Sequence, residues 1–288
     1  MKKLLYGVLA LAIALIAYGT VPPQARADRN YVEPCFYHDT AGADAKASPL
    51  CHGLAELWNF EEGSDSDRFG VFKTPLLEPS GVNVPSAAGR LGNGIDLESS
   101  GAQDTFTGFV NLGGAPYTIA AWVKLEDLPV NVGDRMTIVS WDTDNVPGPH
   151  LYVERFSTGP SYRACLANKE TETTSSVALC FSAMGLISGN WHLIVAGESP
   201  YFVGKSRLFV SLDGGTITTS ATAYYTSPGI HILDVGTRRT KISGATFQNR
   251  FDGVIDQLAF WKRAFSQTDV NLLYNSGSGR AYPFDTET

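Results

Sequence analysis

The stretch FDGVIDQLAFWKRAFSQTDVNLLYNSG, residues 251–277, decides the fold. Its first half is rich in branched and aromatic residues, which is typical of a buried β-strand. One carboxylate, Asp256, lies in the middle of this apolar run. Burying a carboxylate costs several kcal/mol unless the group gains partners. Asp256 is therefore a catalytic acid, a metal ligand or a structural device.

The second half of the same stretch predicts a short C-terminal helix, the only helix that the sequence indicates. Ser266 is a suitable N-cap, and Asp269 three residues later completes a short version of the capping box. Gly277 is placed to end the helix. Apolar residues at helical spacing share one face, namely Val270, Leu273 and Tyr274.

Upstream of this stretch, short β-rich runs alternate with turn signals. Branched and aromatic residues recur at near period two, and Gly, Pro or Asp breaks follow every ten or so residues. The runs are AELWNF (55–60), GNGIDL (92–97), YTIAAWVKL (117–125), RMTIVSW (135–141), HLYVERF (150–156), NWHLIVAG (190–197) and SRLFVSLDGG (206–215). This pattern predicts an all-β sandwich or barrel.

The chain opens with the three-part pattern of a secretory signal peptide, residues 1–27. Two lysines precede an apolar stretch, residues 4–18, and the small-x-small site ARA follows at residues 25–27. We expect cleavage after Ala27, because the apolar stretch is short for a membrane span. An uncleaved anchor is the alternative. The protein is thus expected to be secreted or periplasmic, in the cell envelope, with a membrane as partner only if the signal segment is uncleaved.

The chain is acidic, with a formal net charge of -7. Residues 1–27 hold three basic groups and no acidic ones, so the mature chain has a net charge of -7 - 3 = -10. An acidic surface argues against nucleic acid or an anionic membrane as the main partner. It fits a soluble secreted protein, and it attracts divalent cations.

Four cysteines follow the expected cleavage site, and in an exported protein an even count predicts disulfides. Three pairings are possible, and the local one, Cys35–Cys51 with Cys165–Cys180, is the simplest. Cys165 and Cys180 lie in two strand-like runs separated by a polar stretch, so they are placed to face each other across a hairpin. Each bridge closes a loop of about fifteen residues, worth roughly 3 kcal/mol. A zinc site is not favoured, because no C-x-x-C or closely spaced Cys/His quartet is present.

The cysteines also suggest the domain organisation. Residues 28–52 are polar and irregular, with a cysteine at each side. They predict an N-terminal extension tied down by a disulfide. Residues 53–288 are expected to form one domain.

Six motifs in order resemble the laminin G-like, concanavalin A-like jelly-roll domain of bacterial secreted proteins, over roughly Leu54 to Pro283. The motifs are LWNFEEGS (57–64), GRLGNGIDLESS (89–100), YTIAAWVKLED (117–127), NWHLIVAGE (190–198), SRLFVSLDGG (206–215) and the closing stretch 251–277. The resemblance implies two antiparallel sheets packed face to face. It also implies a role in binding carbohydrate or another extracellular ligand, although fold alone does not settle function.

The same fold carries glycosidases and polysaccharide lyases. Retaining glycosidases need two carboxylates about 5–5.5 Å apart, and related enzymes place them on one strand as Glu-x-Asp-x-x-Glu or Glu-x-Asp-x-Glu. The chain has neither pattern, and it has no Gly-x-Ser-x-Gly. His192 follows Trp191 where the family carries a Trp-His pair, which favours a structural histidine. We therefore expect a binding module for a glycan or an extracellular protein. The alternatives are a glycoside hydrolase or polysaccharide lyase, and a non-catalytic structural envelope protein.

Two acidic loops, EEGSDSD (61–67) and WDTDN (141–145), have the composition of a Ca²⁺ site. The resemblance implies a structural calcium between an early loop and the last strand, which by position points to Asp67 and Asp256. The candidates in the second loop are Asp142 and Asp144. The competing interpretation is that the loop aspartates are solvated turn formers. Asp256 is then expected to accept backbone hydrogen bonds, or a calcium ion, that tie its strand to the first loop.

Sugar sites combine exposed aromatic faces with acids and amides. The aromatic candidates outside the regular strand patterns are Trp141, Tyr162, Tyr201, Phe202, Tyr224 and Tyr225. Those to which we assign ligand contact are Trp141, Tyr201, Tyr224 and Tyr225. The other tryptophans lie in strand patterns that match the family and are predicted to be core, namely Trp58, Trp122, Trp191 and Trp261.

Overall fold

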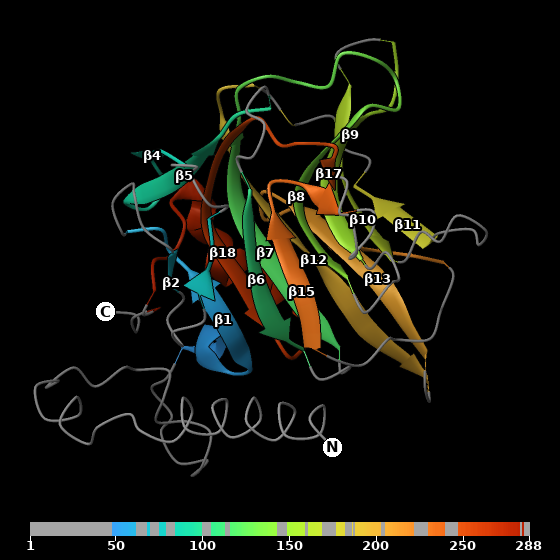
Figure 1. Ribbon diagram of the computed structural model, residues 1–288. Helices are drawn as coiled ribbons and strands as arrows, with labels where there is room; N and C mark the ends of the chain where they lie inside the picture. Colours follow the sequence, from blue (N-terminus) through green and yellow to red (C-terminus); the bar gives the residue numbers. More distant parts are fainter. Residues whose placement is uncertain are drawn as a thin grey trace, which may run out of the picture.

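The fold is a sandwich of two antiparallel sheets (Figure 1). The computed structural model describes residues 48–61, 68–69, 75–78, 84–99, 105–112, 116–142, 149–158, 161–168, 177–181, 186, 188–202, 205–221, 230–239, 247–282 and 284. The predicted all-β, two-sheet jelly-roll sandwich is confirmed. Over the described ranges, no helix is long and apolar enough to cross a membrane.

The larger sheet has eight strands and contains the closing stretch near its middle. Its strand order is β14-β13-β12-β7-β18-β5-β4, and β1 also pairs with β18. Its strands are β1 (Leu54–Trp58), β4 (Ser86–Ala88), β5 (Asn93–Leu97), β7 (Tyr117–Leu125), β12 (Trp191–Phe202), β13 (Lys205–Leu212), β14 (Thr218–Thr219) and β18 (Gly253–Trp261).

The smaller sheet has six strands in the order β11-β10-β9-β8-β15-β6. Its strands are β6 (Phe106–Asn111), β8 (Arg135–Asp142), β9 (His150–Arg155), β10 (Tyr162–Asn168), β11 (Val177–Cys180) and β15 (Ile230–Val235). Two small ribbons accompany the sheets, β2 (Arg68–Phe69) with β3 (Pro75–Leu76), and β16 (Arg238–Arg239) with β17 (Phe247–Gln248).

Period-two alternation divides the apolar residues between two cores. On β7, Ile119 and Val123 face the six-stranded sheet and belong to the main core. Ala120 and Trp122 point to the opposite face and belong to a second core. Both faces of the larger sheet are therefore covered, which explains why β7 is apolar almost throughout.

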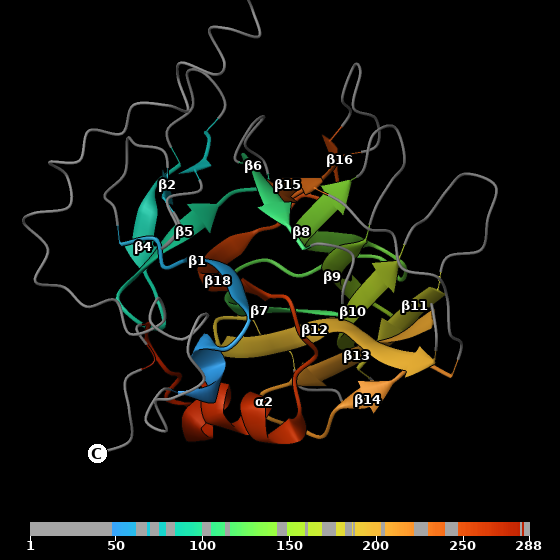
Figure 2. The same ribbon diagram turned by 90° about the horizontal axis from the view of Figure 1, so that it is seen from below.

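The C-terminal helix α2 (Gln267–Tyr274) covers the outer face of the larger sheet (Figure 2). Ser266 is its N-cap, and both hydrogen bonds of the capping box with Asp269 are present, as predicted. Val270 and Leu273 are buried in the second core. The helix ends at Asn275, which adopts the left-handed conformation with φ 48°, so the prediction that Gly277 ends it was wrong by two residues.

Hydrogen bonds attach the segment before β1, residues 49–52, to the end of β18 and the start of this helix. In the 3-10 helix η2 (Pro49–Cys51), the carbonyl of Leu50 accepts a 2.6 Å hydrogen bond from Trp261 Nε1. Arg263 donates to the carbonyls of Pro49 and His52 and forms a bidentate pair with Asp269. Burial raises the pKa of Asp269, but the hydrogen bonds from Arg263 and Ser266 outweigh burial and hold it below its ordinary value.

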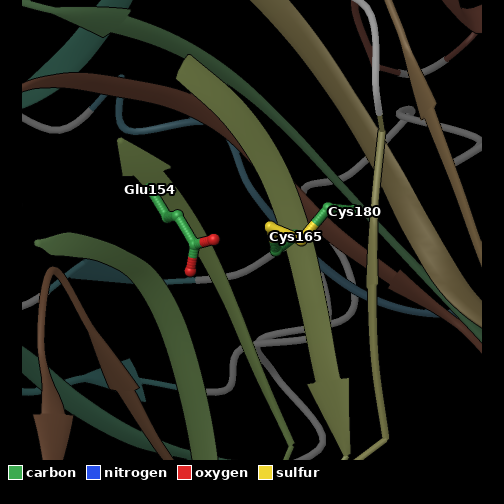
Figure 3. Close-up of side chains that lie close together, drawn as sticks. All are labelled: Glu154, Cys165 and Cys180. Carbon is green, nitrogen blue, oxygen red and sulfur yellow. A yellow bond between two sulfur atoms is a disulfide. The ribbon is translucent and has the colours of Figure 1, made fainter. Parts of the chain in front are cut away.

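The disulfide Cys165–Cys180 is present, as predicted (Figure 3). The two cysteines are register partners on β10 and β11, so the bond joins the edge strand β11 to its neighbour. Cys51 is also disulfide-bonded. Its expected partner, Cys35, lies outside the described residues, as do residues 1–47 as a whole.

Candidate binding surface

Asp256 sits at a bulge in β18. The register of β18 against β7 shifts between Asp256 and Ala259, and Gln257 has a left-handed φ of 52°. One extra residue in a bulge changes which face the following side chains occupy. Trp122 on β7 lies directly opposite Asp256, so no second carboxylate is its register partner there.

The carboxylate of Asp256 ties β18 to the loop between β4 and β5. Its Oδ2 accepts a 2.8 Å hydrogen bond from the backbone N–H of Leu91. Gly89 in this loop must be a glycine, because a Cβ there would lie 2.7 Å from Asp256 Oδ2 and 2.6 Å from the backbone of Asn93. The glycine-rich GRLGNG stretch is therefore explained by close approach to a buried carboxylate.

Burial dominates the electrostatics of Asp256, whose side chain is 0% exposed. Burial raises its pKa to about 7, and the backbone N–H groups of Leu91, Gln257 and Arg90 only partly oppose this. The negative charge of Glu61 adds to the rise. A carboxyl that solvent does not reach cannot protonate a substrate, so these observations favour a structural role over a catalytic one.

Calcium at Asp256 stays a prediction. Ca²⁺ takes six to eight oxygen ligands. Asp256 Oδ2 accepts from the backbone N–H of Leu91, and its Oδ1 is buried and has no hydrogen-bond partner within the described residues. The prediction of backbone hydrogen bonds holds, but the partner is the loop of Leu91 rather than the first acidic loop. Asp67 and Asp144 lie outside the described residues, as does the side chain of Asp142.

Two groups of side chains in the described ranges have the proximity of metal ligands. The first, Glu154 with Cys165 and Cys180, does not offer thiolates because the cysteines form the disulfide (Figure 3). Glu154 is instead held by Arg135 at 3.1 Å and by Arg163 at 2.9 Å. The second group is an acidic cluster at the surface, Asp96, Glu98 and Glu126. The sequence analysis did not single out this cluster, because Asp96 and Glu98 lie at the end of β5 whereas Glu126 follows β7.

Two of the aromatic predictions were wrong. Trp141 is 1% exposed and belongs to the main core, with edge-to-face contacts to Tyr117 and Phe260 at centroid distances of 5.6 and 6.1 Å. Tyr162 is buried in the same core. Both lie in strands on the inward side of the pleat. Tyr224 and Tyr225 lie outside the described residues. The core predictions hold for Trp58, Trp122 and Trp261, and Trp191 is half-buried against the second core.

Tyr201 is exposed, as predicted. Its side chain is 47% exposed, and the adjacent Phe202 is 55% exposed. Their rings lie 4.8 Å apart at 52°. Lys205 Nζ lies 5.2 Å from the centroid of the Phe202 ring, and the guanidinium carbon of Arg207 lies 3.5 Å from the centroid of the Tyr201 ring. We call these four residues the tip cluster.

The tip cluster belongs to the end of the β12–β13 hairpin that extends past its neighbour. Pairing of β12 with β7 stops at Glu198 opposite Tyr117, whereas pairing with β13 continues to Phe202 opposite Lys205. Figure 1 shows the two strands running together at this end of the sandwich. The rings of Tyr201 and Phe202 therefore stand beyond the three-stranded part of the sheet and belong to neither apolar core.

The outer face of the six-stranded sheet carries a polar row in which Ser140, His150 and Asp234 are buried and Thr107 is half-buried. Thr107, Asp234, Ser140 and His150 are successive register partners on β6, β15, β8 and β9. Thr107 Oγ1 donates to Asp234 Oδ1 at 2.9 Å, and Ser140 Oγ donates to the carbonyl of Thr237 at 3.0 Å. His150 is fully buried. This row is thus closed to a ligand, in contrast to the tip cluster.

His192 has a structural arrangement, as the sequence favoured. Its Nδ1 lies 2.7 Å from Asp213 Oδ2, and Asp213 Oδ1 also accepts from the N–H of Leu193. Asp213 has a φ of 50° in the turn that follows β13. The pair therefore connects the start of β12 to the end of β13 at the opposite end of the hairpin from the tip cluster.

Solved structures with a similar fold include receptor-binding domains of botulinum neurotoxins. The binding domain of serotype D/C VPI 5993 has a TM-score of 0.54 and 12% sequence identity, with 78% of this chain and 52% of that chain covered. The binding domain of neurotoxin DC in complex with rat synaptotagmin II has a TM-score of 0.55, 14% identity, and 78% and 51% coverage. This chain therefore spans about half the length of the structures it matches.

No curated protein matches the chain. The family model described as the concanavalin A-like lectin/glucanases superfamily matches residues 98–271, more than half of the 288 residues. The match covers most strands of both sheets and extends into α2. It agrees with the resemblance seen in the sequence motifs. The chain belongs to the concanavalin A-like lectin/glucanases superfamily.

Proposed function

We propose that the protein is an exported binding domain that recognises a carbohydrate through the tip cluster. The observation that carries the proposal is the exposure of two adjacent aromatic rings, Tyr201 and Phe202, which neither core uses. Isolated exposed apolar residues are ordinary on a protein surface. Two aromatic rings in contact at a strand end, with cations over their faces, form a compact feature with a specific geometry.

The chemistry of the tip cluster suits a sugar. Tyrosine and phenylalanine present large, rigid apolar faces at low cost in side-chain entropy. The C–H face of a pyranose ring stacks on such a surface, while its hydroxyls accept hydrogen bonds from lysine and arginine. The hairpin is a rigid support, because β13 also pairs with β14 further along.

An extracellular protein is the second candidate ligand. Tyrosine and arginine are enriched at the energetic centres of protein interfaces, and both are present in the tip cluster. The binding domain of botulinum neurotoxin DC, which shares the fold, was solved in complex with rat synaptotagmin II. At 14% identity this supports the fold alone, so the carbohydrate remains the primary proposal.

We propose no catalytic activity for this chain. Asp256 is buried beneath a loop, and Glu154 is engaged by two arginines. Export is likewise proposed from the N-terminal pattern, and a disulfide-bonded domain suits an oxidising compartment.

A glycan array with the purified protein and two variants tests the binding proposal. The double variant Tyr201→Ala, Phe202→Ala removes the aromatic faces. Phe109→Ala is the matched control, because Phe109 is 54% exposed on β6 in the other sheet. We expect saturable binding by the wild type and by the control, and loss of binding by the double variant. Equal binding by all three proteins would place the site elsewhere. Release of product from a bound polysaccharide would favour an enzyme.

A further inference from the structure

We propose that the saccharide is acidic and that Arg207 binds its carboxylate. This inference rests on the proposed function of the tip cluster and concerns the chemical class of its ligand. It follows from the state of the Arg207 guanidinium, from the second cation beside it, and from the contrast between this local charge and the acidic remainder of the chain.

The guanidinium of Arg207 has hydrogen-bonding capacity that the described protein does not use. Within the described residues, its Nε is buried and has no hydrogen-bond partner. Its close contact is instead the ring of Tyr201, 3.5 Å from the guanidinium carbon. A guanidinium has five N–H donors in a rigid plane. One stacked on a ring is held in a fixed orientation, and because Nε is buried, a ligand would meet the N–H groups of the two terminal nitrogens.

Other arginines of the described residues use donors of the guanidinium within the protein. Arg90, which stacks on Trp122, also has a buried Nε without a hydrogen-bond partner, but its Nη2 donates to the carbonyl of Gly277. Arg263 forms a bidentate pair with Asp269 and two further hydrogen bonds with backbone carbonyls. Arg163 also stacks on a ring, that of Phe156, but it is paired with Glu154. Arg207 resembles Arg163 without its carboxylate, so a carboxylate from a ligand fits the vacant part of the same arrangement.

The geometry of the tip cluster matches a uronic acid better than a neutral sugar. A planar guanidinium matches a carboxylate with two parallel hydrogen bonds. Lys205, opposite Phe202 across the hairpin, adds a second positive charge. In a sugar acid the carboxylate and the apolar ring face are a few ångströms apart, as are the guanidinium and the exposed aromatic surface.

The net charge of the chain does not oppose this assignment. The formal net charge is -7, but at physiological ionic strength charges act over a Debye length of about 8 Å. Lys205 and Arg207 each lie within this distance of an exposed ring of the tip cluster. The acidic surface elsewhere disfavours non-specific binding of an acidic polymer, so binding concentrates at the tip cluster.

The test is binding to acidic polysaccharides and to matched neutral forms. The probes are polygalacturonate, alginate and hyaluronan, each beside its methyl-esterified counterpart. The variants are Arg207→Gln, and Lys262→Gln as the control, because Lys262 is an exposed cation that follows β18, which β7 separates from β12. We expect an acidic probe to bind about tenfold more tightly than its ester, since a charge-assisted hydrogen bond is worth about 1.5–3 kcal/mol. Arg207→Gln abolishes this preference and Lys262→Gln keeps it. Melting curves check that each variant is folded.

Three kinds of result overturn the inference, and they can be told apart. Equal affinity for acid and ester, or an acid preference that survives in Arg207→Gln, contradicts the role of Arg207 while leaving carbohydrate binding intact. Absence of binding to every acidic, esterified and neutral saccharide contradicts the proposed function as well. Binding that Tyr201→Ala removes and Arg207→Gln does not change assigns a neutral ligand to the same cluster.

Discussion

Two regions of the molecule each place a charged group beside an aromatic side chain, with opposite results. Asp256 lies opposite Trp122 in the middle of the larger sheet, fully buried, and backbone N–H groups meet it. Arg207 lies over Tyr201 at the end of a hairpin, and its Nε has no partner within the described residues. The buried carboxyl ties β18 to the loop between β4 and β5 through the N–H of Leu91, and burial opposes its ionisation. The guanidinium of Arg207 is oriented by the ring of Tyr201 but is not paired with a carboxylate of the described residues, and we propose that it pairs with a ligand.

The largest expected effect is a dependence of stability on pH that comes from Asp256. Its pKa is raised from 3.8 to about 7, so between these values the folded state keeps a proton that the unfolded state has lost. Stability is therefore greatest below the unfolded pKa and falls as pH rises toward 7, by roughly 4 kcal/mol at 1.36 kcal/mol per pKa unit. Denaturant unfolding across this range measures the slope.

The variant Asp256→Asn isolates this contribution. Asparagine keeps an oxygen that accepts from the N–H of Leu91 but does not ionise. We expect the slope between about pH 4 and about pH 7 to flatten in this variant, so that its stability is close to that of the wild type at acidic pH and exceeds it at and above about pH 7, where the wild-type carboxyl ionises. An unchanged slope would assign the pH dependence to other groups and contradict the buried-charge account.

The second effect is the loss of the hydrogen-bond acceptor. Asp256→Ala removes the partner of the N–H of the half-buried Leu91, which costs up to about 1–3 kcal/mol. Measured at acidic pH, where the carboxyl is protonated in the wild type, the free energy of unfolding should fall by that amount. Ligand binding at the tip cluster should not change. A loss of binding with unchanged stability would reverse the roles of the two regions.

The third prediction concerns Tyr201→Ala, which should change the free energy of unfolding little and the affinity for the saccharide strongly. Tyr201→Ala removes a side chain that belongs to neither core, so the free energy of unfolding should change by less than about 0.5 kcal/mol. Affinity for the saccharide should fall by about tenfold or more, because the ring supplies the stacking surface. Chemical denaturation and a binding isotherm on the same preparation separate the two quantities.

The smallest expected effect is that of metal removal. Because the oxygen Oδ2 of Asp256 is occupied by N–H donors, we expect EDTA to change the melting temperature by less than about 2 °C, below the shift that 1 kcal/mol produces in a domain of this size. A clear fall that Ca²⁺ reverses would instead support calcium in the acidic loops of Asp67 and Asp144.

Local patterns in the sequence predicted the elements well. Ser266 and Asp269 form the capping box as expected, because capping depends on residues only three positions apart. The pairing of Cys165 with Cys180 also followed from two neighbouring runs joined by a polar stretch. In each case the determining contacts are close in sequence.

Features set by tertiary contacts were not predicted. Trp141 was predicted to contact a ligand because it was placed outside the regular strand patterns, yet it shares the inward face of β8 with Val139. That period-two relation was a signal in the sequence that would have placed it in the core. The stacking of Arg207 on Tyr201 depends on the register of a hairpin, and the contact of Asp256 with Leu91 joins residues 165 positions apart. Neither contact can be predicted from residues that are close together in the sequence.

The most direct test measures binding and stability together in Arg207→Gln and Asp256→Asn, using polygalacturonate, alginate and hyaluronan with their methyl esters. The account predicts that Arg207→Gln loses the preference for the acid and keeps the unfolding free energy of the wild type. It predicts that Asp256→Asn keeps the preference and changes the pH dependence of unfolding. The opposite assignment, with acid recognition lost in Asp256→Asn and retained in Arg207→Gln, would contradict it.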